Sequence, residues 1–138
     1  MDSVVVLLDD PLGGVVVSDG QRQEPLTEQT LELISDSKLV WLVADRRTLR
    51  RVMRRGGYPA RCVCLPDYNR LLEQAGAETV SLPEPLRPEA LVEAANQVGD
   101  RLRLHGLDRV AKLESSFLPV CEQLQAAGLP IDLMAWDD

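Results

Sequence analysis

Arginine is concentrated in one short stretch of this chain, residues 46–55. Six of these ten residues are arginine, and guanidinium groups pair with phosphate oxygens, the contacts that dominate nucleic-acid affinity. The pattern suggests a phosphate-binding face made of Arg46, Arg47, Arg50, Arg51, Arg54 and Arg55. The simpler interpretation is a solvated helix face whose cations lie near the negative end of the helix dipole. The sequence leaves both interpretations open.

A helix must present these arginines, and the sequence marks both of its ends. Residues 39–43 are apolar, with β-branched and aromatic side chains, and they predict a buried central strand just before the helix. Asp45 then stands at the N-cap position, and Gly56 and Gly57 provide a left-handed stop after the last arginine. One apolar stripe is expected to hold the helix against the core, made of Leu49, Val52 and Met53.

Length and composition predict one folded domain. The chain has 138 residues, of which 45% are hydrophobic and 27% charged, enough to bury a core. Its formal net charge is −7, so any basic surface must be local and the whole molecule is not a sequence-independent nucleic-acid binder. No apolar run approaches eighteen residues, and acidic residues occupy the place of a basic leader. We expect a cytoplasmic protein that does not enter a membrane.

The three cysteines and the single histidine do not form a recognisable site. Cys62 and Cys64 lie on a predicted strand, residues 61–65, where we expect them to point to opposite faces and to stay reduced together with Cys121. One histidine and a Cys-x-Cys pair cannot supply four zinc ligands. His105 is interpreted as an exposed residue at a helix end, not as a catalytic base, since no serine or cysteine partner is visible.

Apolar periodicity and turn residues predict the remaining elements. Strands are expected at residues 3–8, 15–18 and 21–26, with a further short strand at 79–82. Helices are expected at residues 28–35, 66–75, 88–105 and 107–127, the last kinked at Pro119. This order of strands and helices is that of a ribonuclease H-like α/β fold, a mixed sheet whose antiparallel first strands are followed by parallel ones.

Three segments near the C-terminus resemble the junction between the exonuclease-like domain and the thumb of family A DNA polymerases. These are residues 106–114 (GLDRVAKLE), the step Leu118-Pro119-Val120, and residues 127–132 (AGLPID). Earlier segments are similar to the 3′ to 5′ exonuclease domain of the same polymerases, namely residues 15–20, 23–26, 38–40 and 58–67. The resemblance implies an exonuclease-like α/β domain at residues 1–105 and a helical connection towards a polymerase thumb at residues 106–138.

The catalytic motifs of that exonuclease family are incomplete in this chain. Such enzymes use four carboxylates to hold two divalent metals. Asp9 and Asp10 stand at the first motif, but Pro11 follows where a glutamate is expected. Asp45 matches the aspartate of the second motif. Near residues 86–91, where the third motif should supply an aromatic or histidine and an aspartate, the polar residues are Arg87 and Glu89.

The resemblance therefore implies a catalytically inactive domain without a cofactor. It would support the neighbouring polymerase domains and contact primer-template DNA through the six arginines. One alternative is a residual exonuclease that binds Mg²⁺ through Asp9, Asp10 and Asp45. A free-standing α/β protein-interaction module is the second alternative.

Overall fold

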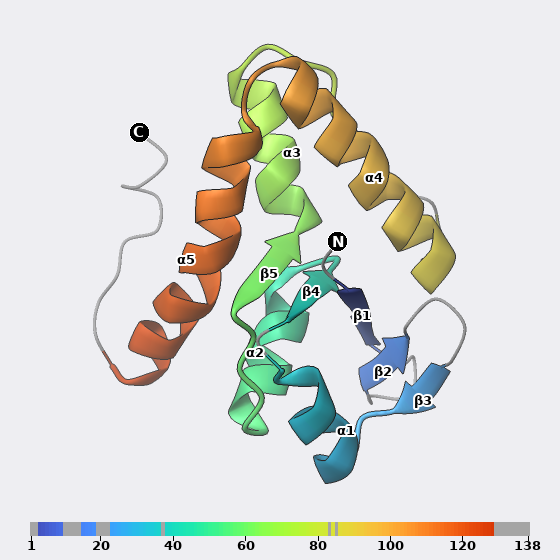
Figure 1. Cartoon of the computed structure of the whole chain (residues 1–138), viewed down its shortest axis with the longest axis vertical. Coiled ribbons are helices and arrows are strands. Elements are labelled where there is room, and N and C mark those ends of the chain that lie inside the picture. Colours follow the sequence, from blue (N-terminus) through green and yellow to red (C-terminus); the bar gives the residue numbers. More distant parts are fainter. Residues whose placement is uncertain are drawn as a thin grey trace.

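The computed structural model of the protein describes residues 3–9, 15–18, 23–36, 38–82, 84 and 86–128. These residues form a central sheet with helices on both of its faces (Figure 1). The predicted mixed α/β class is therefore confirmed. Residues 10–14, which include the candidate Asp10, residues 19–22, Pro83, Pro85 and residues 129–138 lie outside the described residues.

The sheet has five strands in the order β3-β2-β1-β4-β5. Their bounds are β1 (Ser3–Asp9), β2 (Val15–Ser18), β3 (Gln23–Pro25), β4 (Leu39–Val43) and β5 (Arg61–Cys64). β1, β4 and β5 pair in parallel, with Leu7 opposite Val43 and Val43 opposite Cys64. β2 runs antiparallel to both β1 and β3. The central strands are apolar because helices cover them on both faces.

Helices divide between the two faces of the sheet. α1 (Glu28–Ile34) and α2 (Arg46–Arg54) share one core cluster with strand residues such as Val5 and Trp41. α3 (Leu65–Gln74) and α4 (Pro88–Leu104) share the other cluster with Val6 and Leu42. α5 (Asp108–Ala126) packs beside β5 at the edge of the sheet and contributes to both clusters, through Leu118 and Ala111.

Local signals explain why the elements around α2 begin and end where they do. The Asp45 carboxylate accepts a hydrogen bond from the Thr48 backbone N–H at 2.8 Å, which caps α2. Gly56 has φ +106°, the left-handed conformation that ends the helix. Gly57 allows the chain to pass close to the core, since a Cβ there would lie 2.6 Å from Leu31 Cδ1. The predicted strand, cap and glycine stop are therefore confirmed.

Two expectations from the sequence were wrong. Residues 79–82 do not form a strand, because the Asn69 side chain takes the place of a neighbouring strand: its amide donates to the Val80 carbonyl at 2.8 Å and accepts from the Val80 N–H at 3.0 Å. Cys62 and Cys64 do not point to opposite faces. Both lie buried in the same core cluster, because side chains two positions apart on a strand share a face.

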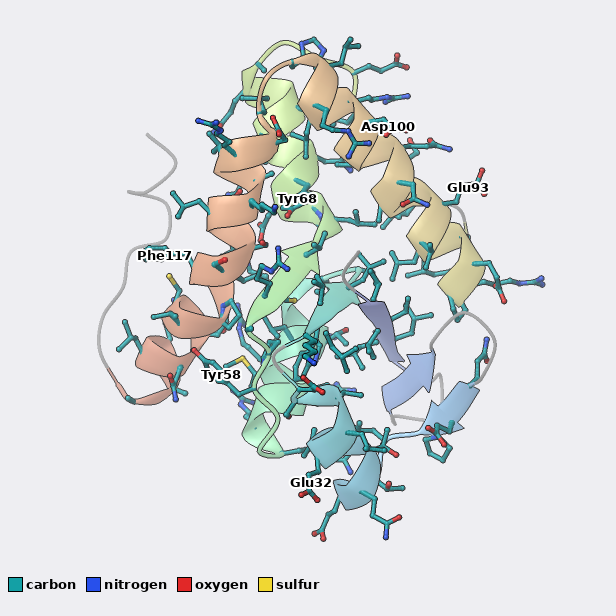
Figure 2. All side chains as sticks on the ribbon, in the orientation of Figure 1. Glu32, Tyr58, Tyr68, Glu93, Asp100 and Phe117 are labelled. Atoms are coloured by element: carbon teal, nitrogen blue, oxygen red, sulfur yellow. The ribbon has the colours of Figure 1, made fainter. Side chains whose placement is uncertain are left out.

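α5 is one helix across Pro119. It is joined to the rest of the fold by polar contacts as well as by its core residues. Tyr68 lies between α3 and α5 (Figure 2), where its hydroxyl donates to the Ala111 carbonyl at 3.0 Å. Burial raises the pKa of Tyr68, although the nearby Ser115 opposes this shift. Within the described ranges, none of the helices has the length and apolarity that a membrane span requires.

Candidate nucleic-acid interface

The apolar stripe of α2 is buried in the core, and the arginines occupy the other sides of the helix. Leu49 and Val52 are fully buried, and Met53 packs against the same cluster. The arginines do not form one uniform surface. They differ in what they contact, and this difference decides which of them could reach a phosphate.

Arg46 is bound to a buried carboxylate at the start of α3. Its Nε donates to Asp67 Oδ2 and its Nη2 to Asp67 Oδ1, both at 2.9 Å. Arg70 donates to the same Oδ1 at 2.7 Å. Burial lowers the pKa of Arg46, but the hydrogen bonds and charge of Asp67 outweigh this effect, so the pKa is raised. This guanidinium therefore joins α2 to α3 and is not available to a ligand.

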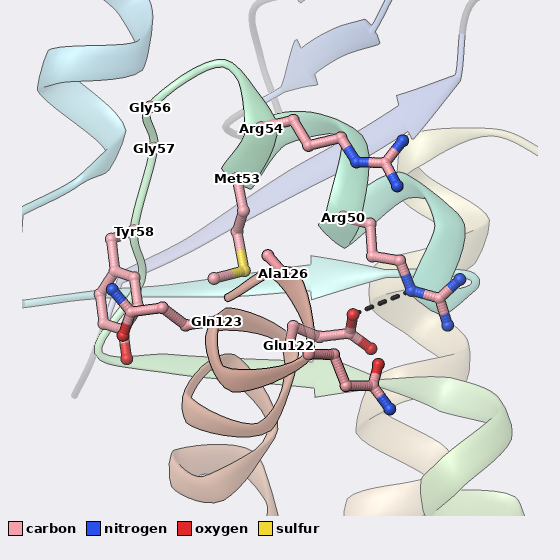
Figure 3. Close-up of a pocket in the computed structure, with 10 residues that line it drawn as sticks. Arg50, Met53, Arg54, Gly56, Gly57, Tyr58, Glu122, Gln123 and Ala126 are labelled. Atoms are coloured by element: carbon pink, nitrogen blue, oxygen red, sulfur yellow. Dashed lines mark hydrogen bonds and ion pairs between the residues drawn. The ribbon is translucent and has the colours of Figure 1, made fainter. Parts of the chain in front are cut away.

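Arg50 reaches in the other direction, towards α5. Its Nε donates to Glu122 Oε2 at 2.8 Å (Figure 3). The Glu122 side chain is 3% exposed, whereas that of Arg50 is 48% exposed. The second oxygen of this carboxylate, Oε1, is buried and has no hydrogen-bond partner within the described part of the chain. One carboxylate oxygen is therefore compensated and the other is not.

The remaining arginines of the stretch have different surroundings. Arg55 donates to the Leu26 carbonyl at 2.8 Å and so fixes the entry to α1. Arg51 is partly buried and interacts within the fold. Arg47 and Arg54 are exposed, and their side chains bond to no other residue that the structure describes. These two lie seven positions apart, hence on the same side of the helix and about 10 Å apart along its axis.

A cleft of about 590 Å³ opens between the end of α2, the loop after it and the end of α5. Met53 and Ala126 face each other across it, and Arg50 and Arg54 lie at one side (Figure 3). Its walls combine cationic, carboxylate, amide, aromatic and apolar groups, from Arg50, Met53, Arg54, Gly56, Gly57, Tyr58, Glu122, Gln123, Gln125 and Ala126. Such a lining can bind an anion through guanidinium groups. None of the lining residues that the structure describes is a serine, cysteine or histidine that could act as a nucleophile.

The sheet places two of the three candidate catalytic residues at the ends of neighbouring strands. Asp9 is the last residue of β1, and Asp45 follows the end of β4. Because Leu7 pairs with Val43 in parallel, both aspartates stand at the carboxyl ends of adjacent strands. The Asp45 carboxylate oxygen Oδ1 is already engaged, since it accepts from the N–H of Thr48 at 2.8 Å and from its hydroxyl at 3.0 Å.

Other residues considered from the sequence lie apart from this edge. Arg87 and Glu89 are exposed at the start of α4, and His105 is exposed at its end. Burial raises the pKa of Cys62 and of Cys64, so both thiols stay protonated at neutral pH. Among residues 3–128 as far as they are described, no three His, Cys, Asp or Glu side chains gather in a way that could hold a metal ion.

Sequence reasoning does not single out the two buried carboxylates that bind these arginines, Asp67 and Glu122. Glu122 lies on the buried side of α5, next to Leu118 and Cys121. A charged residue on the buried side of a helix indicates a buried ion pair. For Asp67 the signal was weaker, because an acidic residue in a first helical turn has a sufficient local role.

No protein-family model matches this chain, and no curated protein matches it.

Proposed function

We propose that this chain is a non-catalytic, exonuclease-like domain of a family A DNA polymerase, with a ribonuclease H-like sheet. The observation that carries the proposal is the edge where β1 and β4 end. Asp9 ends β1 and Asp45 follows the end of the adjacent β4, the two positions at which the first two exonuclease motifs are expected. An antiparallel β1-β2-β3 unit extended in parallel by β4 and β5 supports the same fold assignment.

The carboxylates that should complete a two-metal site are replaced in this chain, which supports an inactive domain. Pro11 replaces the glutamate of the first motif, and Arg87 and Glu89 occupy the region of the third. One Asp45 oxygen caps α2. The number of carboxylates sets the affinity of an oxygen site for hard divalent cations, so two aspartates are too few for two metals. The domain would then act as a support for the polymerase region.

In this role α2 contacts primer-template DNA through Arg47 and Arg54. These side chains extend on the side of α2 away from the core, whereas Arg46, Arg50 and Arg55 are bound to groups inside the fold. Two phosphate contacts give weak, salt-sensitive binding, because each contact releases counterions. Of the six arginines, Arg47 and Arg54 would make the principal contacts with DNA phosphates, and the exposed part of Arg50 lies beside them.

Fluorescence anisotropy with a labelled primer-template tests the proposal. We expect binding that weakens between about 50 and 200 mM salt, and that falls at least about tenfold in the variant Arg47→Ala/Arg54→Ala. The variant Arg87→Ala/Arg103→Ala removes the same charge elsewhere and should bind almost as the original chain does. Equal losses in both variants, or no binding at all, would refute the contact through α2.

The position of Asp9 and Asp45 at the ends of adjacent strands favours one second candidate, a residual metal-dependent 3′ to 5′ exonuclease. In that case Asp9, Asp10 and Asp45 would hold Mg²⁺ or Mn²⁺. The labelled strand would then shorten in Mn²⁺, and Asp45→Asn, which retains a capping oxygen, would abolish the shortening. An intact strand after long incubation with Mn²⁺ would instead agree with the inactive domain.

A further inference from the structure

The cleft between the ends of α2 and α5 contains a buried acceptor that the fold leaves without a partner. Glu122 is one of its lining residues, and the carboxylate oxygen Oε1 is buried with no hydrogen-bond partner within the described part of the chain. The other oxygen, Oε2, accepts from Arg50 Nε at 2.8 Å. A buried polar atom without a partner is costly, so a ligand that donates a hydrogen bond to Oε1 would be stabilised in this cleft.

The charges around the cleft favour an anion at only one side of it. Arg54 is exposed, and its side chain bonds to no other residue that the structure describes. Arg50 is half exposed, but Glu122 neutralises part of its charge. α2 and α5 both end at the cleft, and the negative ends of their dipoles disfavour an anion beside the loop. An anionic group is therefore expected between Arg54 and the exposed part of Arg50.

The rest of the lining suits a flat, uncharged ring. Met53 and Ala126 face each other across the cleft, and Tyr58 lies on the other side of Met53 from Arg50 (Figure 3). Tyr58 is 37% exposed, so part of its ring is open to a ligand. Aromatic and thioether side chains both make favourable contacts with a ring. The cleft therefore combines a place for a ring, a buried acceptor and a place for an anion.

We propose that this cleft binds a nucleoside monophosphate unit, either a free nucleotide or the terminal nucleotide of a strand with a free sugar hydroxyl. The phosphate pairs with Arg54 and with the free nitrogens of Arg50, and the base packs against Tyr58 and Met53. The sugar hydroxyl donates to Glu122 Oε1. The last torsion of a glutamate side chain is broad, so a small rotation turns Oε1 towards the hydroxyl while Oε2 still accepts from Arg50.

The size and position of the cleft agree with this ligand. Its volume of about 590 Å³ lies within the roughly 300–1,000 Å³ of small-molecule sites. Asp45 caps the first turn of α2, whereas the cleft lies at the last turn of this helix of 9 residues, about 13 Å away along its axis. The nucleotide site is therefore separate from the strand ends that carry Asp9 and Asp45.

Isothermal titration calorimetry of the full chain with adenosine 5′-monophosphate tests the site. We expect a dissociation constant on the order of 100 µM, since the ligand makes few contacts in an open cleft. Adenosine lacks the phosphate and inorganic phosphate lacks the base, so each should bind at least about tenfold more weakly. Equal binding of inorganic phosphate would mean an anion site only and would overturn the proposal. Absence of nucleotide binding up to about 5 mM would overturn it as well.

Variants of Tyr58 test the place of the base. Tyr58→Ala removes the ring and should weaken nucleotide binding at least about fivefold, whereas Tyr58→Phe should bind as the original chain does. The backbone N–H of Tyr58 donates to Ser35 Oγ at 3.2 Å, and both variants retain this bond. Circular dichroism and urea midpoints establish that each variant is folded. Unchanged binding in the folded Tyr58→Ala variant would overturn the site.

Glu122→Gln tests the hydroxyl contact, because glutamine has one acceptor oxygen and Arg50 already requires it. The original chain should bind the 2′,3′-dideoxy analogue of the nucleotide about fivefold more weakly than the nucleotide itself. The Glu122→Gln variant should bind the two ligands equally. A fivefold difference that persists in the variant would mean that Glu122 does not receive the hydroxyl, and would overturn this arrangement of the ligand.

A short labelled single strand of deoxyadenosine nucleotides distinguishes the two sources of the ligand. If Tyr58→Ala weakens both ligands, the cleft also accepts the end of a strand; if it weakens only the mononucleotide, the ligand is a free nucleotide. The site does not depend on the polymerase assignment. Arg47 is not among the lining residues, so Arg47→Ala should weaken primer-template binding and leave mononucleotide binding unchanged. The two proposals can therefore fail separately.

Discussion

Two buried carboxylates connect the arginines of α2 to other helices, and they are satisfied to different degrees. Asp67 and Glu122 are 6% and 4% exposed. Both Asp67 oxygens accept hydrogen bonds from arginine, two from Arg46 and a third from Arg70. Glu122 accepts one hydrogen bond on Oε2, from Arg50, and none on Oε1 within the described residues.

Arginines of the same helix therefore bind their carboxylates in two ways, Arg46 through two hydrogen bonds and Arg50 through one. A bidentate pair in a partly buried site fixes geometry and fully compensates the charge it buries. The Arg46 and Asp67 pair thus acts as a clamp between α2 and α3. A single bond from a half-exposed arginine leaves part of the carboxylate uncompensated, so the Arg50 and Glu122 pair holds α5 less firmly.

The largest effect is expected from breaking the complete cluster. Asp67→Asn should lower the free energy of unfolding by about 3 kcal/mol, because it leaves Arg46 and Arg70 without their shared counterion. This value is at the lower end of the range for buried pairs, since the arginine side chains are 23% and 33% exposed and water can reach them. Urea unfolding followed by circular dichroism gives the measurement.

The matched control for this substitution is an exposed pair of similar chemistry. Arg103 bonds to Asp100 across one turn of α4, and the Asp100 side chain is 71% exposed. Asp100→Asn should therefore change stability by less than about 0.5 kcal/mol. Equal losses at Asp67 and Asp100 would mean that burial does not distinguish the two pairs.

An intermediate effect is expected when one of the two arginines around Asp67 is removed. Arg46→Met should cost about 2 kcal/mol, because two charge-assisted hydrogen bonds are lost while Arg70 still donates to Asp67 Oδ1. The methionine retains most of the apolar stem of the arginine side chain, so the substitution removes mainly the charge and its hydrogen bonds. Urea midpoints of Arg46→Met and Asp67→Asn, measured side by side, would contradict the clamp if the arginine variant were the less stable.

Short-range signals made much of this fold predictable. The run at residues 39–43, the Asp45 cap and the glycines after α2 each act within a few positions, and the structure has them as expected. The same reasoning could not pair Arg46 with Asp67 or Arg50 with Glu122, which are 21 and 72 positions apart. Sequence periodicity does not say which distant element a charged side chain will meet.

α5 shows the same limit for apolar residues. In the sequence Leu113, Phe117 and Leu118 are all apolar residues of the helix expected at residues 107–127, and nothing distinguishes them. In the structure Leu118 is buried, whereas Leu113 and Phe117 are exposed. An apolar pattern that covers most of a helix predicts the helix but not its buried face, because that face depends on where β5 and α4 come to lie.

The smallest effect is expected from the incomplete pair. Glu122→Gln should change the free energy of unfolding by no more than about 1 kcal/mol in either direction. The amide oxygen can still accept from Arg50, and Arg50 is exposed enough for water to replace part of the lost attraction. Loss of an uncompensated buried charge at Oε1 offsets the rest. A loss near 3 kcal/mol, as at Asp67, would mean that Oε1 has a partner of its own and that both carboxylates are equally compensated.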